Sequence, residues 1–127
     1  MAGHLPRPTD AELAILRVLW ERGPSTVRQV HGALTGVRET GYTTTLKLMQ
    51  IMTEKGLVTR DESARTHVYA AHLSQDQTQR QLVNDLLDRA FGGRSAALVM
   101  HALSAQPASA EELQEIRKLI EQYKAKG

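Results

Sequence analysis

The spacing of the apolar residues changes once along this chain, at Gly56. Before Gly56, apolar residues recur at the three- and four-residue spacing of amphipathic helices. Just after it, two short β-prone runs, residues 57–60 and 66–70, bracket a polar stretch and predict a two-stranded hairpin. Such a hairpin is not stable alone and must pack on the helices. The helical spacing returns after Leu73, so the sequence predicts helices, one hairpin and further helices.

Four capping boxes predict where helices begin. In each, a Ser or Thr is followed three residues later by Glu or Gln, so that the two side chains accept hydrogen bonds from each other's backbone N–H groups. The four boxes begin at Thr9, Thr26, Ser74 and Ser109. The expected helices end at Gly23, near Gly36, at Gly56, at Gly92-Gly93 and before Pro107.

Three helices followed by a hairpin are typical of a winged helix-turn-helix. We therefore expect a mostly α fold with a small β-hairpin, in which residues 1–72 form a DNA-binding domain and residues 73–127 a helical dimerisation domain. The third helix of such a fold enters the DNA major groove, while the hairpin, or wing, contacts a neighbouring phosphate or groove. A winged-helix protein–protein adaptor without DNA binding is the alternative.

The third helix, expected from about Thr43 to Lys55, has two distinct faces. One face is predicted to join the core and carries Thr45, Leu48, Met49 and Met52. The opposite face is predicted to contact DNA bases and carries Thr43, Thr44, Lys47 and Gln50. Gln pairs well with adenine, Lys reaches guanine or phosphate, and short hydroxyls at a helix N-terminus suit phosphate or a thymine methyl.

Further residues of the front half are candidates for phosphate contacts. Residues 1–72 hold nine Lys and Arg against seven Asp and Glu, whereas residues 73–127 hold seven of each. This distribution favours an anionic partner for the front half. The candidates are Arg65 at the wing tip, Arg60 and His67 on its arms, Arg28 and His31 on the second helix, Tyr42 at the entry to the third, and Arg38 in the loop between them.

The segment after residue 73 is too rich in apolar faces to remain exposed to water. Its helices are separated by a glycine pair and a proline, and they do not form an evident core of their own. A second copy of the chain would bury them, so we expect a two-fold homodimer. The residues expected at the dimer interface are Leu86, Leu87, Leu98, Val99, Leu103, Leu113, Ile116, Ile120 and Tyr123.

Several other classes of protein do not fit this sequence. It has no cysteine, no glycine-rich phosphate loop and no two histidines at helical ligand spacing, so we expect neither an enzyme nor a metal or other cofactor. A metal sensor using His67 and His72 is the weaker alternative. No apolar run approaches the length of a membrane span, and the N-terminus has no apolar leader, so we expect a cytoplasmic protein.

Several blocks of the sequence resemble one family. Residues 9–20, the run Tyr42-Thr-Thr-Thr, residues 54–58, a hairpin ending at Tyr69 and the helical tail resemble the penicillinase-repressor family of BlaI/MecI-like regulators. The resemblance implies a dimeric repressor that binds a palindromic operator and controls β-lactamase-type or stress-response genes. It also implies that proteolytic cutting of the tail, triggered through a membrane-bound sensor protease, relieves repression.

The chain departs from the family pattern in three places. Leu46 and Ile51 stand where the recognition helix of the family often carries arginines. His101-Ala102 stands where β-lactam-responsive members have an Asn-Phe scissile pair, so the candidate cleavage region, Met100 to Ala102, lacks the scissile pair of those members. The paired tail cysteines of copper-responsive relatives are absent.

Overall fold

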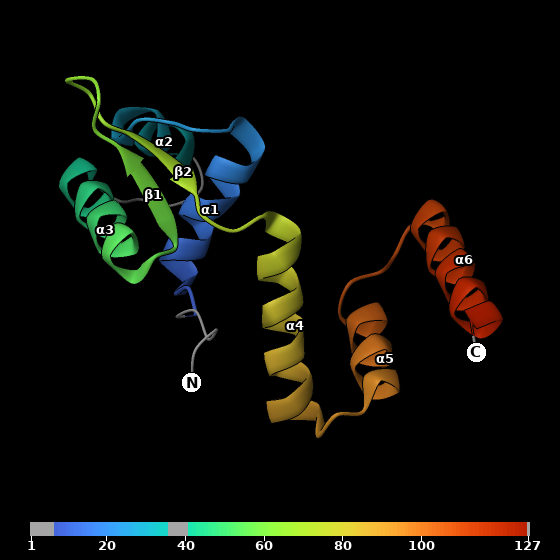
Figure 1. The fold of residues 1–127 in the computed structure, drawn as a ribbon. Coiled ribbons are helices and arrows are strands. Elements are labelled where there is room, and N and C mark those ends of the chain that lie inside the picture. The colour runs from blue at the N-terminus through green and yellow to red at the C-terminus, as the bar shows by residue number, and fades with distance from the viewer. Residues whose placement is uncertain (1–6, 36–40, 127) are drawn as a thin grey trace. The chain divides into compact units, whose positions relative to one another are not determined.

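The computed structural model describes residues 7–35 and 41–126, so Gly36 and Arg38 lie outside the described residues. Within these ranges the chain forms six helices and one two-stranded sheet (Figure 1). In chain order the elements are α1 (Asp10–Arg22), α2 (Val27–Leu34), α3 (Tyr42–Lys55), β1 (Val58–Asp61), β2 (Val68–Ala71), α4 (Gln75–Phe91), α5 (Ser95–Ala105) and α6 (Ala110–Lys126). The predicted fold class, mostly helical with one hairpin, is confirmed.

All four predicted capping boxes form. In the first, the Glu12 N–H donates to Thr9 Oγ1 at 3.2 Å, and the Thr9 N–H donates to Glu12 Oε1 at 2.9 Å. The same reciprocal pair occurs between Thr26 and Gln29 at the start of α2. It also occurs in the boxes that begin at Ser74 and Ser109. The starts of four helices are therefore determined by local sequence.

The hairpin begins one residue later than the apolar pattern predicts. Gly56 ends α3 in the left-handed conformation, with φ of 82°, and the Leu57 N–H then donates back to the Met52 carbonyl at 2.9 Å. Because the helix end uses this N–H, the ladder starts at Val58, which pairs with Ala71. The second arm, expected at residues 66–70, is the strand 68–71.

The hydrophobic core lies between α1, α2, α3 and the hairpin. Tyr69 fastens the hairpin to the helices, because its backbone N–H and C=O pair with those of Ser25 at 2.8 and 2.9 Å. The Trp20 indole N–H donates to the Leu73 carbonyl at 3.0 Å. The buried apolar residues are Ile15, Leu16, Leu19, Val27, Val30, Leu34, Met49, Met52, Leu57, Val58 and Tyr69.

An ion pair joins the start of α1 to the end of α3. Lys55 Nζ lies 2.7 Å from Glu12 Oε1, and the Glu12 side chain is only 3% exposed. Burial raises the pKa of Glu12, but the hydrogen bonds from Lys55 and Thr9 outweigh it, and the pKa is lowered overall. Glu12 therefore serves both as a helix cap and as a tie between two helices.

The tail differs from the front of the chain in its burial. By their backbone contacts, residues 1–82 and 83–127 form two compact units. No residue of α5 or α6 is buried, and α4 buries only Thr78. Among the described helices, none is long and apolar enough to cross a membrane.

Candidate nucleic-acid interface

The two faces of α3 separate as the sequence predicts. Thr45, Met49 and Met52 are completely buried, and Leu48 is half-buried. The residues of the opposite face, Thr43, Thr44, Lys47 and Gln50, are all exposed. Lys47 forms no ion pair with another described residue. The outer face of α3 therefore presents a cation, an amide and two hydroxyls to solvent.

Hydrogen bonds fix the N-terminal turn of α3. The buried Thr45 hydroxyl donates to the Gly41 carbonyl at 3.3 Å, and Nδ1 of His31 on α2 lies 3.2 Å from the same hydroxyl oxygen. The direction of the hydrogen bond between His31 Nδ1 and the Thr45 hydroxyl depends on the tautomer of His31. His31, predicted as a phosphate contact, thus holds the start of α3 against α2.

Tyr42 forms a cluster with two side chains of α2. The His31 ring packs edge-on against the Tyr42 ring with centroids 5.7 Å apart. The Arg28 guanidinium lies 5.6 Å from the Tyr42 ring centroid, a cation–π contact. Arg28 forms no ion pair with an acidic side chain among the described residues. We call Arg28, His31 and Tyr42 the Tyr42 cluster.

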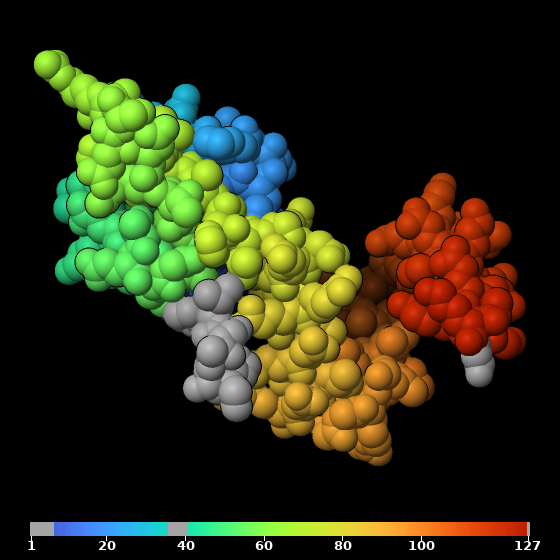
Figure 2. Space-filling model, in the orientation of Figure 1, coloured from blue at the N-terminus to red at the C-terminus, as the bar shows by residue number. Residues whose placement is uncertain are grey.

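A shallow hollow of about 300 Å³ separates the Tyr42 cluster from the wing. Arg28 and Tyr42 line it from the helices, and Arg65 and His67 line it from the wing. The other lining residues are Thr26, Val27, Leu46, Thr66 and Tyr69. Figure 2 shows the tip of the hairpin projecting beyond the helices that carry it. Four of the predicted phosphate contacts therefore surround one concave surface.

The remaining predicted wing contact, Arg60, already has partners. It donates from Nε to Glu62 Oε2 at 2.9 Å, and its Nη2 lies 2.9 Å from the same oxygen. Hydrogen bonds to Tyr69 and then to Glu62 raise the pKa of Arg60 above its ordinary value. The backbone N–H of Ser63 donates to Asp61 Oδ1 at 2.9 Å and lowers the pKa of that carboxyl.

The predicted dimer residues lie on the tail helices with much of their surface exposed. Tyr123 is 71% exposed, Ile120 51% and Leu86 47%. Val99, Leu103 and Leu113 are also exposed, and Leu87, Leu98 and Ile116 are half-buried. Met100 is 68% exposed and lies with His101 and Ala102 inside α5. His101 packs against Phe91 at 5.6 Å between ring centroids.

Among the described residues, no group of three or more His, Asp or Glu side chains is arranged to hold a metal ion. His67 and His72, the residues of the metal-sensor alternative, lie at opposite ends of β2. The sequence alone therefore suggested a pair of metal ligands that the fold does not bring close together.

Comparison with known proteins identifies the family. The family model described as penicillinase repressor matches residues 8–122. The chain belongs to the penicillinase repressor family. It is 36% identical to the transcriptional regulator BlaI of Mycobacterium tuberculosis over 124 residues, which are 95% of this chain and 88% of that protein. It is 22% identical to the penicillinase repressor of Bacillus licheniformis over 94% of both chains. The family and these relatives are regulators of transcription, not enzymes.

Two solved structures share the fold of the front half. One is the solution structure of the DNA-binding domain of the repressor BlaI, with a TM-score of 0.51 and 21% identity over 57% of this chain and 88% of that one. The other is the solution structure of monomeric Bacillus licheniformis BlaI in complex with the blaP half-operator. Its TM-score is 0.51, with 20% identity over 57% of this chain and 89% of that one. The predicted winged-helix fold is confirmed.

Sequence reasoning missed part of the site. Thr26 and Leu46 line the hollow, yet neither was predicted as a site residue. The ion pair of Glu62 with the Arg60 guanidinium was not predicted either. The opposite charges of Arg60 and Glu62, two residues apart at the end of the first arm, gave a signal for their ion pair. No local signal marked Thr26 and Leu46, which come together only when α2 and α3 pack.

Proposed function

We propose that this chain is a homodimeric transcriptional repressor that binds a palindromic operator through α3 and the wing. The observation that carries the proposal is the single surface formed by the outer face of α3, the Tyr42 cluster and the wing tip. Its cations Arg28, Lys47 and Arg65 have no acidic partner among the described residues. The solved half-operator complex of a relative with the same fold supports DNA as the partner.

The chemistry of this surface divides into base contacts and phosphate contacts. Lys47 and Gln50 lie in the second and third turns of α3, where side chains of a recognition helix reach base edges in the major groove. Arg28 and Arg65 line the hollow from α2 and from the wing and supply positive charge for the DNA backbone. The phosphate contacts give affinity, and the base contacts give sequence preference.

A second copy of the chain is the partner we propose for the tail. The exposed apolar side chains of α4, α5 and α6 form faces that a monomer leaves in water. A two-fold dimer buries such faces and places two recognition helices on two half-sites. Because both half-sites are then linked, the second contact becomes intramolecular and the affinity rises.

A sensor protease is the partner we propose for relief of repression, following the family resemblance. The segment Met100 to Ala102 lies within the helix α5, so a protease must open that helix before it can cut the chain there. The repressor and its operator share one compartment in this scheme, which agrees with the cytoplasmic location expected from the sequence.

The test is binding of a short inverted-repeat duplex from the chain's own promoter region. Lys47→Ala and Arg65→Ala should each weaken binding about tenfold, since one base or phosphate contact contributes about 1–3 kcal/mol. Lys118→Ala, which removes an exposed charge from α6, is the control and should bind like the parent. Equal binding by all four proteins would refute the proposed surface.

A further inference from the structure

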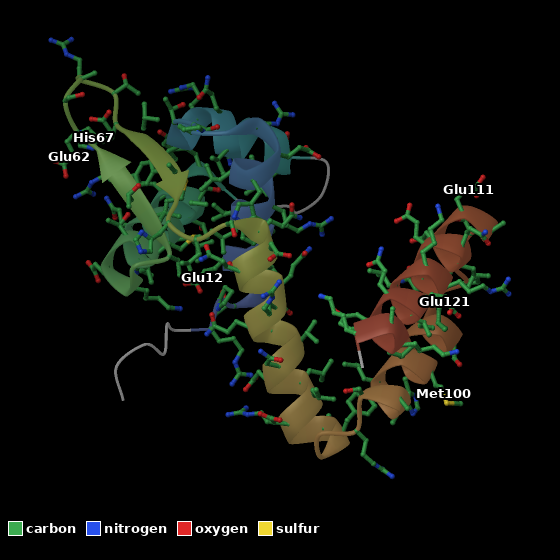
Figure 3. All side chains as sticks on the ribbon, turned by 45° about the vertical axis from the view of Figure 1, so that its right-hand side comes forward. Glu12, Glu62, His67, Met100, Glu111 and Glu121 are labelled. Carbon is green, nitrogen blue, oxygen red and sulfur yellow. The ribbon has the colours of Figure 1, made fainter. Side chains whose placement is uncertain are left out.

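The cationic side chains of the wing are not equally available to a ligand. Arg65 is exposed and forms no ion pair with another described residue. The guanidinium of Arg60, by contrast, is occupied by Glu62 of the same hairpin. Figure 3 shows Glu62 and His67 where the hairpin extends beyond its paired strands.

The geometry of the Arg60–Glu62 pair resembles a bound phosphate. Nε and Nη2 of Arg60 are both 2.9 Å from Glu62 Oε2, so the carboxylate occupies the side-on edge of the guanidinium. The same edge binds the oxygens of a phosphate group. A DNA phosphate and Glu62 therefore compete for the same donors.

Arg60 also lies beside the surface proposed to contact DNA. It is directly opposite Tyr69 in the ladder, and opposite residues point to the same face of the hairpin. Tyr69 itself lines the hollow with Arg28 and Arg65. Once free of Glu62, Arg60 is placed to add a further phosphate contact next to theirs.

We propose that Glu62 is an internal phosphate mimic, which occupies Arg60 in the free protein and gives it up when the wing docks on DNA. This inference rests on the proposed DNA binding. The two side chains are 29% and 55% exposed, so their ion pair is weak enough for a phosphate to displace it. Because phosphate contacts are independent of sequence, Glu62 lowers the affinity for all DNA and limits non-specific binding.

The test compares Glu62→Gln with Asp61→Asn. Both variants remove one negative charge from the wing and keep a side-chain oxygen that accepts hydrogen bonds, from Arg60 in the first and from Ser63 in the second. Only the first removes the charge that pairs with Arg60 and so weakens its hold on the guanidinium. Glu62→Gln should bind both the operator and a random-sequence duplex about threefold more tightly per subunit, the worth of an exposed ion pair. Because Arg60 contacts a phosphate in the bound state of both proteins, the slope of log affinity against log salt concentration should change by much less than the roughly 0.9 per subunit of one added contact. Asp61→Asn should change the affinity much less than Glu62→Gln does.

Arg60→Ala completes the test. Alone it should change binding less than Arg65→Ala does, and combined with Glu62→Gln it should abolish the gain. A gain that survives without Arg60, or that Asp61→Asn reproduces, would overturn the phosphate-mimic proposal. If the parent chain binds no duplex at all, the DNA-binding proposal fails first, and circular dichroism of each variant confirms that the fold is retained.

Discussion

At the scale of single residues, Glu12 links local and tertiary structure. It caps α1 and accepts from Lys55, and its pKa is lowered in the folded chain. Because the folded pKa lies below the unfolded one, the stabilisation is complete above the ordinary carboxyl range and is lost as pH falls through the folded pKa. The capping box was evident from the sequence, but the ion pair was not, because its partner is 43 residues away.

Glu12→Gln tests the charge without removing the cap, since Gln also completes a capping box. We expect a loss of about 1–3 kcal/mol in the free energy of unfolding at pH 7, because the carboxylate charge that pairs with the Lys55 ammonium is lost. Urea titrations from pH 7 to pH 3 should show that the difference from the parent shrinks as Glu12 becomes protonated. Glu21→Gln, on the exposed side of α1, should leave stability nearly unchanged at every pH.

Thr45 is a second residue whose side-chain hydroxyl can be tested by a single substitution. Thr45→Val keeps the shape but leaves the Gly41 carbonyl and His31 Nδ1 without their shared hydroxyl. We expect a cost of about 1–2 kcal/mol in unfolding and weaker DNA binding, because the start of α3 loses its attachment to α2. Thr53→Val, which removes a hydroxyl bonded to Met49 at the other end of α3, should spare DNA binding. Loss of binding in both variants would show that the position of the hydroxyl does not matter.

At the scale of elements, the sequence predicts best what neighbouring residues determine. The four capping boxes and the glycine ends set the helices, and the change of spacing at Gly56 located the hairpin within one or two residues. The bridge between Ser25 and Tyr69 could not be foreseen, because Ser25 is a single residue without a strand pattern of its own. The same limit applies to the hollow, whose lining comes from three separate segments.

Replacing each of two glycines by alanine should change the stability of the chain in opposite directions. Gly56 ends α3 at φ of 82°, whereas Gly32 lies inside α2, and a Cβ added at either position meets no atom within 4 Å. Gly56→Ala should therefore destabilise the chain by about 1 kcal/mol through backbone strain alone. Gly32→Ala should stabilise it by up to about 1 kcal/mol, because alanine favours helix. Thermal unfolding checks both, and shifts of the same sign would contradict the assignment of Gly56 as the helix end.

At the scale of the whole molecule, the proposed dimer makes the tail responsible for the oligomeric state. The parent should scatter light as a particle of about twice 14.1 kDa at micromolar concentration. Ile120→Asp places a charge on the apolar face of α6 and should give the monomer, with the helices of the front unit intact. Gln122→Asp, which adds a charge to an exposed polar position of the same helix, should remain a dimer. A monomeric parent would show that the exposed apolar faces serve another partner.

The most direct test of the account is the salt dependence of operator binding. If each subunit neutralises three or four phosphates, the slope of log affinity against log salt concentration should be roughly −5 to −7 for the inverted-repeat duplex. Fluorescence anisotropy of the labelled duplex, titrated with the parent chain at several salt concentrations, measures this slope. The account predicts tight, salt-sensitive binding that favours this duplex over a scrambled one. Indifference to every duplex at low salt would contradict it and leave the winged helix as a protein–protein adaptor.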